Sequence, residues 1–431
     1  MTWLVLLAVA VLLAAGTALA YVIGGASVLV FLATDNARYI AILPQKIFSQ
    51  IDVFVLMAMP LFILAGEIMN RGGVTRALID LSMALVGRLR GGLGHVNIMT
   101  SVFFAGISGS AVADAAALSN TLVPAMRERG YGGTFAGAIT AASSIIGPIV
   151  PPSIILIFYG ALMQTSVTAL FIAGILPGLL LAAALFLVNA LIAWRDGHPR
   201  LSAAEKPRLA PTLARALPAL GLPAIIVGGI VFGWMTPTEA AAVAVIAAIG
   251  ASLVYDGLSR ELFRESLRRT AILTGSIFMI LTAVAALGHV AALERLPEAI
   301  SETVAGWGLG PLGFMLALNL ILLVAGMIFD IPVALALLVP LLAPIALAQG
   351  VDPVHLGIIV CFNLSIGLIS PPLGGCLLVV STVANLDYWR LARAVLPFIL
   401  VQVVVLGLLV AVPEISLALP RALGLVAAPS P

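Results

Sequence analysis

Two short stretches of the chain place a glycine, a serine and a pair of prolines together in apolar surroundings. One reads Ile-Gly-Pro-Ile-Val-Pro-Pro-Ser over residues 146–153, and the other reads Ile-Gly-Leu-Ile-Ser-Pro-Pro over residues 366–372. A Pro-Pro pair lacks two backbone donors and favours an extended connection, so it interrupts a helix and leaves carbonyl oxygens free. Carbonyl and hydroxyl oxygens are ligands for hard cations. We therefore predict two helix breaks, each able to ligate a cation.

Two serines and an aspartate in a stretch rich in small residues, and one aspartate in the second half of the chain, are further candidate ligands. Ser108, Ser110 and Asp114 lie within Gly-Ile-Ser-Gly-Ser-Ala-Val-Ala-Asp, and Asp330 lies within Gly-Met-Ile-Phe-Asp-Ile-Pro. A buried carboxylate without a partner is costly, so we expect Asp330 to be buried and to hold Na+ or a proton, the alternative being a water-exposed residue at the hairpin tip. Asp114 has a weaker claim, because it either caps a helix or faces an aqueous cavity. Hydroxyls inside helix breaks are better candidates than those in intact helices, which bond back to the preceding turn.

The elements that position these residues must be membrane helices. Of 431 residues, 62% are hydrophobic and 9% are charged, and the mean hydropathy is +1.20. A soluble domain carries about 25% charged residues, so this chain cannot cover itself with a water-facing surface. Its length suffices for roughly ten or more spans. The net charge of +2 gives no indication of nucleic-acid binding.

Three smaller points follow from the same apolar composition. Cys361 and Cys376 both lie in apolar stretches and are expected to be buried thiols, with neither a metal-binding spacing nor a disulfide framework. The apolar segment 1–33 is expected to be retained in the membrane. Whether it forms one long span or two short ones broken near Gly24-Gly25 stays open.

A skeleton of glycines and prolines recurs in the two halves of the chain at a constant spacing. The partners lie 220 positions apart (326 − 106, 372 − 152) without a gap. They are Gly106 and Gly326, Pro124 and Pro344, Gly130 and Gly350, Gly137 and Gly357, Gly147 and Gly367, and the pairs Pro151-Pro152 and Pro371-Pro372. Apolar residues match by chance, but a shared skeleton of this kind does not easily do so. The chain therefore contains a duplicated unit.

Basic residues mark the cytoplasmic loops of membrane proteins and so indicate orientation. Arginines flank segment 95–126 on both sides, which predicts a re-entrant hairpin that opens toward the cytoplasm, whereas a second hairpin at about residues 306–348 opens from the opposite face. We therefore predict an all-α polytopic membrane protein with two inverted repeats, each with a re-entrant helical hairpin and a broken transmembrane helix. The spaced charges at residues 71–90 and 260–269 are typical of interfacial amphipathic helices.

Inverted repeats with breaks at matching places are typical of secondary transporters, which bind solute and ion where the unwound segments meet. Helix N-termini at the hairpin tips favour an anionic substrate. A passive channel would leave the repeat unexplained. An intramembrane aspartyl hydrolase built on Asp114 and Asp330 would need both carboxyls to share one water, and neither aspartate lies in a catalytic signature. We therefore predict a transporter and not an enzyme.

Taken together, the motifs resemble the large membrane subunit (M-subunit type) of a TRAP, or tripartite ATP-independent periplasmic, transporter in the ion transporter superfamily. The resemblance covers essentially the whole chain. It rests on the stretches at residues 106–118, 122–126, 146–153, 326–332, 339–344 and 366–374.

This resemblance implies Na+-coupled uptake of a small carboxylate, such as a dicarboxylate, sialic acid or another sugar acid, by an elevator mechanism. It also implies two partners, a small four-helix membrane subunit and a periplasmic substrate-binding protein. The expected location is the cytoplasmic (inner) membrane of a bacterium or archaeon, as a multi-pass protein. A carrier of the same superfamily that works without a binding protein is the alternative.

The resemblance also assigns roles to single positions. At least two Na+ sites are expected, one bordered by Ser108, Ser110, Ser144 and Gly147, and another by Gly326, Asp330, Gly367 and Ser370. Substrate is expected between the two tips, near Ser108, Gly109, Pro151, Pro152, Pro371 and Pro372.

The predicted division of the chain follows the two repeats. It comprises N-terminal scaffold helices with an interfacial helix (1–90), transport-domain repeat one (91–165), scaffold helices with an interfacial arm (166–270), a connecting span (271–306), transport-domain repeat two (307–385), and a C-terminal scaffold helix with a tail (386–431).

Overall fold

The structure, a computed structural model, describes residues 2–34, 36–201, 207–255, 257–306, 308 and 310–427. Every regular element within these ranges is a helix, which confirms the predicted all-α class. The α-helices are α1 (Thr2–Ala14), α2 (Leu19–Ala33), α3 (Leu43–Ile51), α4 (Ala58–Arg71), α5 (Val74–Val86), α6 (Gly92–Ser108), α7 (Ala111–Glu128), α8 (Gly133–Ser144), α9 (Ile154–Met163), α10 (Val167–Arg195), α11 (Leu209–Val231), α12 (Pro237–Val254), α13 (Arg260–Leu293), α14 (Leu296–Gly306), α15 (Pro311–Ile328), α16 (Ile331–Ala348), α17 (Pro353–Gly367), α18 (Gly375–Val383), α19 (Tyr388–Ala411) and α20 (Glu414–Ala422). Two short 3-10 helices, η1 (Ala37–Ile42) and η2 (Phe54–Met57), complete the set.

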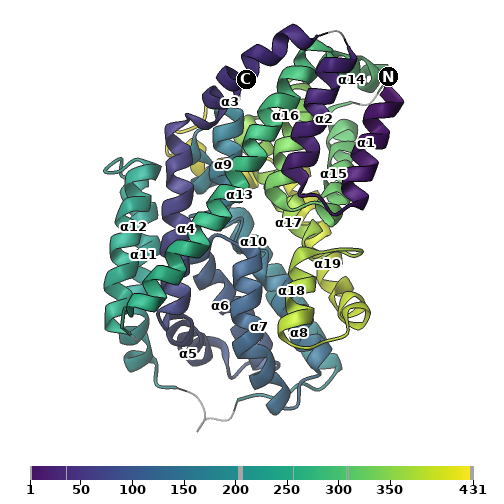
Figure 1. Ribbon diagram of the computed structural model, residues 1–431. Helices are drawn as coiled ribbons and strands as arrows, with labels where there is room; N and C mark the ends of the chain where they lie inside the picture. The colour runs from purple at the N-terminus through teal and green to yellow at the C-terminus, as the bar shows by residue number, and fades with distance from the viewer. Residues whose placement is uncertain are drawn as a thin grey trace.

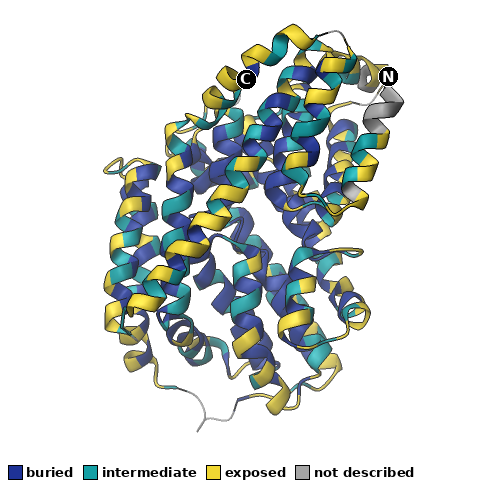
Figure 2. Ribbon diagram, viewed as in Figure 1, coloured by how far each residue is buried: buried dark blue, intermediate teal, exposed yellow. Residues whose placement is uncertain are grey.

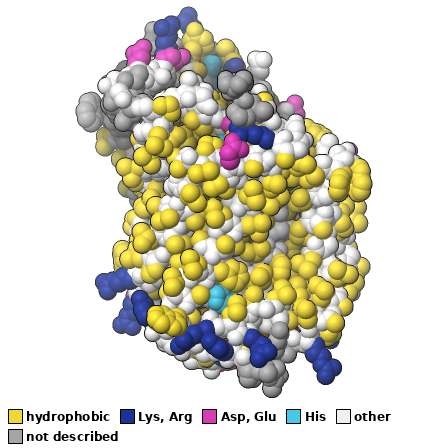
Figure 3. Space-filling view, turned by 180° about the vertical axis from the view of Figure 1, so that it is seen from behind, with side chains coloured by type: hydrophobic (Ala, Val, Ile, Leu, Met, Phe, Trp, Pro, Cys, Tyr) yellow, Lys and Arg dark blue, Asp and Glu magenta, His cyan; other side chains and the backbone are white. Residues whose placement is uncertain are grey.

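Eight helices of the described part are long and apolar enough to cross a membrane. They are η2 with α4, then α10, α11, α12, α13, α15, α16 and α19. The apolar helices α2, α9 and α17 are shorter, so the expectation of ten or more spans exceeds the number of helices that meet the length requirement. Figure 3 shows a broad hydrophobic band across one face of the molecule, with Lys and Arg side chains gathered at one end of it. The chain is a multi-pass membrane protein.

Two helix boundaries differ from the sequence-based expectation. Segment 1–33 forms two helices, but the interruption lies at Gly16, which has a φ of +72°, and α2 runs through Gly24-Gly25 without a break. Gly24 lies against Ala283 of α13, so its missing side chain allows a close helix contact. Residues 260–269 form the first turns of the 34-residue helix α13, so the prediction of a separate interfacial helix there is wrong. A Ser259 N-cap and an unbroken run of helix-forming residues carry the helix straight into its apolar part.

Two helix pairs stand out, each followed by an interrupted helix. Helix pair 1 (α6 and α7) leads to α8 and α9, which are separated by break 1 (residues 145–153), and helix pair 2 (α15 and α16) leads to α17 and α18, which are separated by break 2 (residues 368–374). The ends of α6 and α15, the starts of α7 and α16, and the starts of α8 and α17 all differ by 220 positions (328 − 108, 331 − 111, 353 − 133). A cis Pro-Pro bond lies at the same place in both breaks. The orientation of these units in a membrane stays a prediction, as does the division into scaffold and transport domains.

The two halves cross each other at their broken helices. A Cβ on Gly137 of α8 would approach Leu386, Leu391 and Val380 of the second half, within 2.6, 3.0 and 3.2 Å. A Cβ on Gly357 of α17 would correspondingly approach Tyr159 and Leu170 of the first half, within 2.5 and 2.8 Å. Figure 1 places helix pair 1 in the lower part of the molecule and helix pair 2 in the upper part, with α8 and α18 beside α7 and with α9 in the upper part. Figure 2 shows that these central helices are largely buried, whereas α11, α12 and α13 carry many exposed positions.

Candidate functional site

The turn of helix pair 1 is built from three small residues, Ser108, Gly109 and Ser110, called tip 1 here. Gly109 has a φ of +59°, a conformation that suits glycine and lets the chain reverse direction between α6 and α7. Ser110 caps α7, since its Oγ accepts a hydrogen bond from the Ala113 N–H at 3.4 Å. Its own N–H donates to Ser108 Oγ at 3.2 Å. Helix α7 therefore has its N-terminus at tip 1, as predicted.

Asp114, in the first turn of α7, is completely buried. The Ser108 hydroxyl donates a hydrogen bond to its Oδ1, while Oδ2 is buried with no hydrogen-bond partner among the described residues. A Cβ on Gly147, in break 1, would come within 2.7 Å of this Oδ2. The carboxylate thus fills space that only a glycine leaves free. A buried carboxylate oxygen without a partner requires a cation or a proton.

Tip 1 lies directly against the proline pair of break 1. A Cβ on Gly109 would come within 2.6 Å of the Pro152 carbonyl oxygen and within 3.2 Å of the Ile154 nitrogen. Ser153 begins α9, because its Oγ accepts a hydrogen bond from the Leu156 N–H at 3.2 Å. The structure therefore brings Ser108, Gly109 and Ser110 together with the break, as the sequence predicted from motifs about 40 residues apart.

The corresponding turn of helix pair 2 is Phe329 and Asp330, called tip 2 here. Asp330 caps α16, and its Oδ1 accepts a hydrogen bond from the Ile331 N–H at 3.0 Å. The residue is exposed, so the expectation that Asp330 is the buried carboxylate is wrong; Asp114 holds that place. The physical reason is the extended backbone of Phe329 and Asp330, which leaves the cap side chain at the end of the turn.

Break 2 is joined to helix pair 2 by a contact between main chains. A Cβ on Gly367 would lie 2.3 Å from the carbonyl carbon of Gly326 and 2.5 Å from its Cα. Both glycines were predicted to border a cation site, and the structure places their main chains face to face. Ser370 is 1% exposed, and its hydroxyl donates to the Ile366 carbonyl at 2.9 Å.

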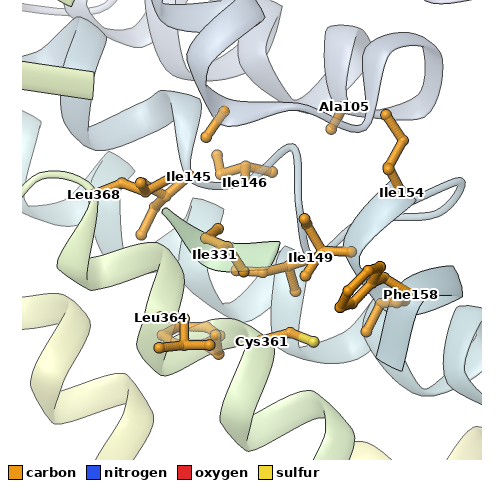
Figure 4. Packing of buried hydrophobic residues seen from close by; sticks show 14 of the residues in the cluster. Ala105, Ile145, Ile146, Ile149, Ile154, Phe158, Ile331, Cys361, Leu364 and Leu368 are labelled. Carbon is orange, nitrogen blue, oxygen red and sulfur yellow. The ribbon is translucent and has the colours of Figure 1, made fainter. Parts of the chain in front are cut away.

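The two breaks meet near the centre of the molecule. Ser144 is fully buried at the end of α8, where its hydroxyl donates to the Ala141 carbonyl at 2.8 Å and lies next to the thiol of Cys376 at the start of α18. Figure 4 shows Ile145, Ile146 and Ile149 of break 1 converging with Ile331 and Leu368 of the second half. The hydroxyls of Ser144 and Ser370 both bond back to the preceding turn, and their oxygen lone pairs remain available to a ligand.

A polar network that the sequence reasoning missed joins each helix pair to its broken helix. In the first half, the Asn97 amide donates to Thr140 Oγ1 at 2.7 Å and the Ser143 hydroxyl donates to Asn97 Oδ1 at 3.0 Å. In the second half, the Asn363 amide donates to Asn319 Oδ1 at 2.6 Å. Ser143 and Asn363 are repeat partners (363 − 143 = 220). The available signal was an asparagine within an apolar stretch, since such residues need a hydrogen-bond partner inside a membrane.

The ligand atoms gathered at the tips and breaks suit a hard cation. They are hydroxyls, backbone carbonyls and one carboxylate, the ligand types of alkali and alkaline-earth ions rather than of zinc. Within the described ranges, no group of three or more His, Cys, Asp or Glu side chains is arranged to hold a metal ion.

Residues 6–415 match the family model described as "Tripartite ATP-independent periplasmic transporter, DctM component". The chain belongs to this family. It is 40% identical to the sialic acid TRAP transporter large permease protein SiaM of Vibrio cholerae, over 91% of the chain and 92% of that protein. It is 37% identical to the C4-dicarboxylate TRAP transporter large permease protein DctM of Pseudomonas aeruginosa, over 94% of both chains. The predicted resemblance is confirmed, and so is the prediction of a transporter rather than an enzyme.

A third DctM-family relative and two solved structures extend the comparison. The 2,3-diketo-L-gulonate TRAP transporter large permease protein YiaN of Escherichia coli is 36% identical over 87% of the chain and 89% of that protein. The Alcanivorax borkumensis YdaH transporter has a TM-score of 0.67 at 15% identity, covering 90% of the chain and 91% of that structure. MtrF of Neisseria gonorrhoeae has a TM-score of 0.63 at 12% identity, covering 93% and 87%. At these identities the two structures show a shared fold only.

Proposed function

We propose that this DctM-family protein is the large membrane subunit of a transporter that takes up a small carboxylate with Na+. The three relatives are named for sialic acid, a C4-dicarboxylate and 2,3-diketo-L-gulonate, which are all organic acids. Helix N-termini at tips 1 and 2 provide partial positive charge for a substrate carboxylate. We therefore place the substrate between the tips, beside the proline pairs of the two breaks.

The observation that carries the proposal is the buried carboxylate of Asp114. One of its oxygens has no hydrogen-bond partner in the part of the chain that the structure describes, and the carboxylate lies beside the Ser108 hydroxyl of tip 1 and the backbone of Gly147. A Na+ ion there would neutralise the carboxylate and take oxygen ligands from Ser108, Ser110, Ser144 and the break. A second Na+ site would be bordered by Gly326, Asp330, Gly367 and Ser370.

The way in which the parts are joined supports an elevator mechanism. The main-chain contact of Gly326 with Gly367 and the crossing of α8 and α17 with the opposite half connect both helix pairs and both breaks into one body. Helices α11, α12 and α13 carry more exposed positions and would provide the stationary scaffold. Sliding the first body against the second would expose the substrate alternately on the two sides of the membrane.

The family description names a tripartite, periplasmic system, which supports two partners. One would be a small four-helix membrane subunit that extends the scaffold. The other would be a periplasmic binding protein that delivers the substrate. A chain that works with a periplasmic partner would lie in the inner membrane of a bacterium or archaeon.

The test is uptake into proteoliposomes that contain the chain and both partners. Radiolabelled sialic acid, succinate and 2,3-diketo-L-gulonate would be offered with and without an inward Na+ gradient. We expect one of them to accumulate only with both the gradient and the binding protein. Uptake without the binding protein would favour the independent carrier, and uptake without Na+ would overturn the coupling.

Variants of the two aspartates locate the coupling ion. Asp114→Asn keeps the shape but removes the charge, so it should raise the Na+ concentration for half-maximal uptake by about tenfold or more. Asp330→Ala should also impair coupling, through the second site. Asp52→Asn is the matched control, because Asp52 is exposed at the end of α3. An unchanged Na+ dependence in both site variants would remove the site assignment and keep the transporter.

A further inference from the structure

A cavity of about 1030 Å³ opens between the end of α4 and the first turns of α13. It lies outside the tips and breaks. Arginines and glutamates dominate its lining: Arg71, Arg260, Arg264, Arg268, Glu261 and Glu265. Ser259 and Leu262 complete it.

The charges of this cavity do not balance. Glu265 is shared by three arginines, at 3.8 Å from Arg71, 2.7 Å from Arg268 and 3.2 Å from Arg269. Arg260 and Arg264 are exposed and have no acidic partner within 4.0 Å among the described residues. Arg71 also pairs with Glu67 at 3.3 Å, and Glu261 adds one more carboxylate to the lining. Arg260 and Arg264, one helical turn apart on the same face of α13, outnumber that carboxylate, so the cavity keeps an excess of positive charge.

The cavity also lies at a definite depth. Helix α13 has 34 residues, about 51 Å of helix, whereas the hydrocarbon core of a bilayer is about 30 Å thick. Its Arg and Glu residues all fall within 260–269, and residues 271–293 contain none. The charged turns must therefore project into the headgroup region, with the apolar part of the helix in the membrane.

Exposed apolar side chains begin next to the arginines on the same helix. Leu267, Ile272 and Leu273 are 43%, 54% and 46% exposed. A ligand held at the cavity would thus have cations at one end and an apolar helix surface at the other. A soluble anion matches the first feature only, whereas a phospholipid matches both.

We propose that this cavity binds the phosphate headgroup of an anionic phospholipid, with the acyl chains lying along α13. Arginine suits this role because its planar guanidinium donates two parallel hydrogen bonds to phosphate oxygens. Basic clusters at the end of a membrane helix attract anionic lipids in general. The lipid would fix the N-terminal end of α13, the longest helix of the proposed scaffold, at the membrane surface.

Native mass spectrometry of the purified full chain in detergent tests the proposal. The probes are dioleoyl-phosphatidylglycerol, dioleoyl-phosphatidylcholine with the same acyl chains, and inorganic phosphate as the soluble anion. We expect phosphatidylglycerol adducts to be retained in preference to phosphatidylcholine. Arg260→Gln with Arg264→Gln should weaken phosphatidylglycerol affinity by about 25-fold, at roughly fivefold for each arginine.

Two controls keep the outcome specific. Arg88→Gln with Arg90→Gln removes the same charge away from the cavity and should leave the affinity unchanged. Arg260→Lys with Arg264→Lys keeps the charge and should retain most of the phosphatidylglycerol affinity. Equal retention of the two lipids, or an unchanged affinity in the Arg260 and Arg264 glutamine variant, would overturn the proposal. Displacement of the lipid by millimolar inorganic phosphate would assign the cavity to a soluble anion, and displacement by the small membrane subunit would assign it to a protein contact.

Discussion

Replacing Gly367 by alanine should separate two helices that now touch through their main chains. The added Cβ would lie 2.3 Å from the Gly326 carbonyl carbon, 2.5 Å from its Cα and 2.6 Å from its oxygen. Carbon atoms in contact need about 3.5–4.0 Å, so α15 and α17 must move apart by roughly 1 Å or more. The three nearest atoms all belong to the backbone of Gly326, so no side-chain rotation can relieve these clashes.

The size of the effect follows from two opposing contributions. Overpacking of this kind costs about 1–3 kcal/mol, and a backbone clash belongs at the upper end of that range. Alanine is favoured over glycine in a helix by about 1 kcal/mol. Gly367→Ala should therefore lower the free energy of unfolding by roughly 2 kcal/mol. It should also reduce uptake, because the contact joins helix pair 2 to break 2.

Gly375→Ala is the matched control, since Gly375 lies in the same region and its added Cβ would meet only Leu368 Cδ2, at 3.5 Å. This variant should be as stable as the parent protein or more stable by up to about 1 kcal/mol. Equilibrium unfolding of the full chain in mixed micelles measures both values, and proteoliposome uptake is measured in parallel. Parent-like stability and uptake in Gly367→Ala would refute the reasoning, because the two main chains would then not be in tight contact.

Three further predictions concern the supporting contacts. Tyr159→Phe removes the 2.9 Å hydrogen bond from the tyrosine hydroxyl to the Pro353 carbonyl and should lower the free energy of unfolding by about 1 kcal/mol in the same micelle titration. Asn363→Ala leaves the buried Asn319 without its partner and should cost about 2–3 kcal/mol there; a loss no larger than that of Tyr159→Phe would contradict the network. His198 lies against the rings of Tyr131 and Phe135, and burial lowers its pKa while neighbouring Asp196 raises it less. Because the undocked loop takes up the proton first as pH falls below about 6.5, the hydrogen-exchange protection factors of residues 196–201, corrected for the intrinsic exchange rate at each pH, should fall from pH 7.5 to 5.5. His198→Gln should abolish that loss of protection.

The breaks and turns were predictable because they depend on local backbone chemistry. Only Gly and Pro interrupt a helix in this way, so their positions at Gly147, Gly367 and the proline pairs locate both breaks without any knowledge of packing. The constant spacing of 220 then pairs each break with its helix pair. The family resemblance added substrate class and partners, which no backbone argument contains.

The burial of the aspartates was not predictable, because it depends on contacts between distant segments. Asp114 is buried since Gly147, 33 positions later (147 − 114), leaves room for its carboxylate. Asp330 has no such neighbour and caps α16 at the surface of tip 2. The continuity of α13 could not be predicted from the sequence either. Charged turns that project from a long membrane helix have the same composition as a separate interfacial helix.

The crossing at Gly137 and Gly357 means that neither half of the chain can fold as an independent domain. Each broken helix packs its glycine face against side chains that the opposite half supplies, so half of the chain expressed alone would expose an apolar groove where its counterpart belongs. Two separately expressed halves should instead assemble with each other. During synthesis the first half is inserted into the membrane before the second half exists. Its apolar groove must then be covered by lipid or a chaperone until Leu386 and Leu391 are inserted.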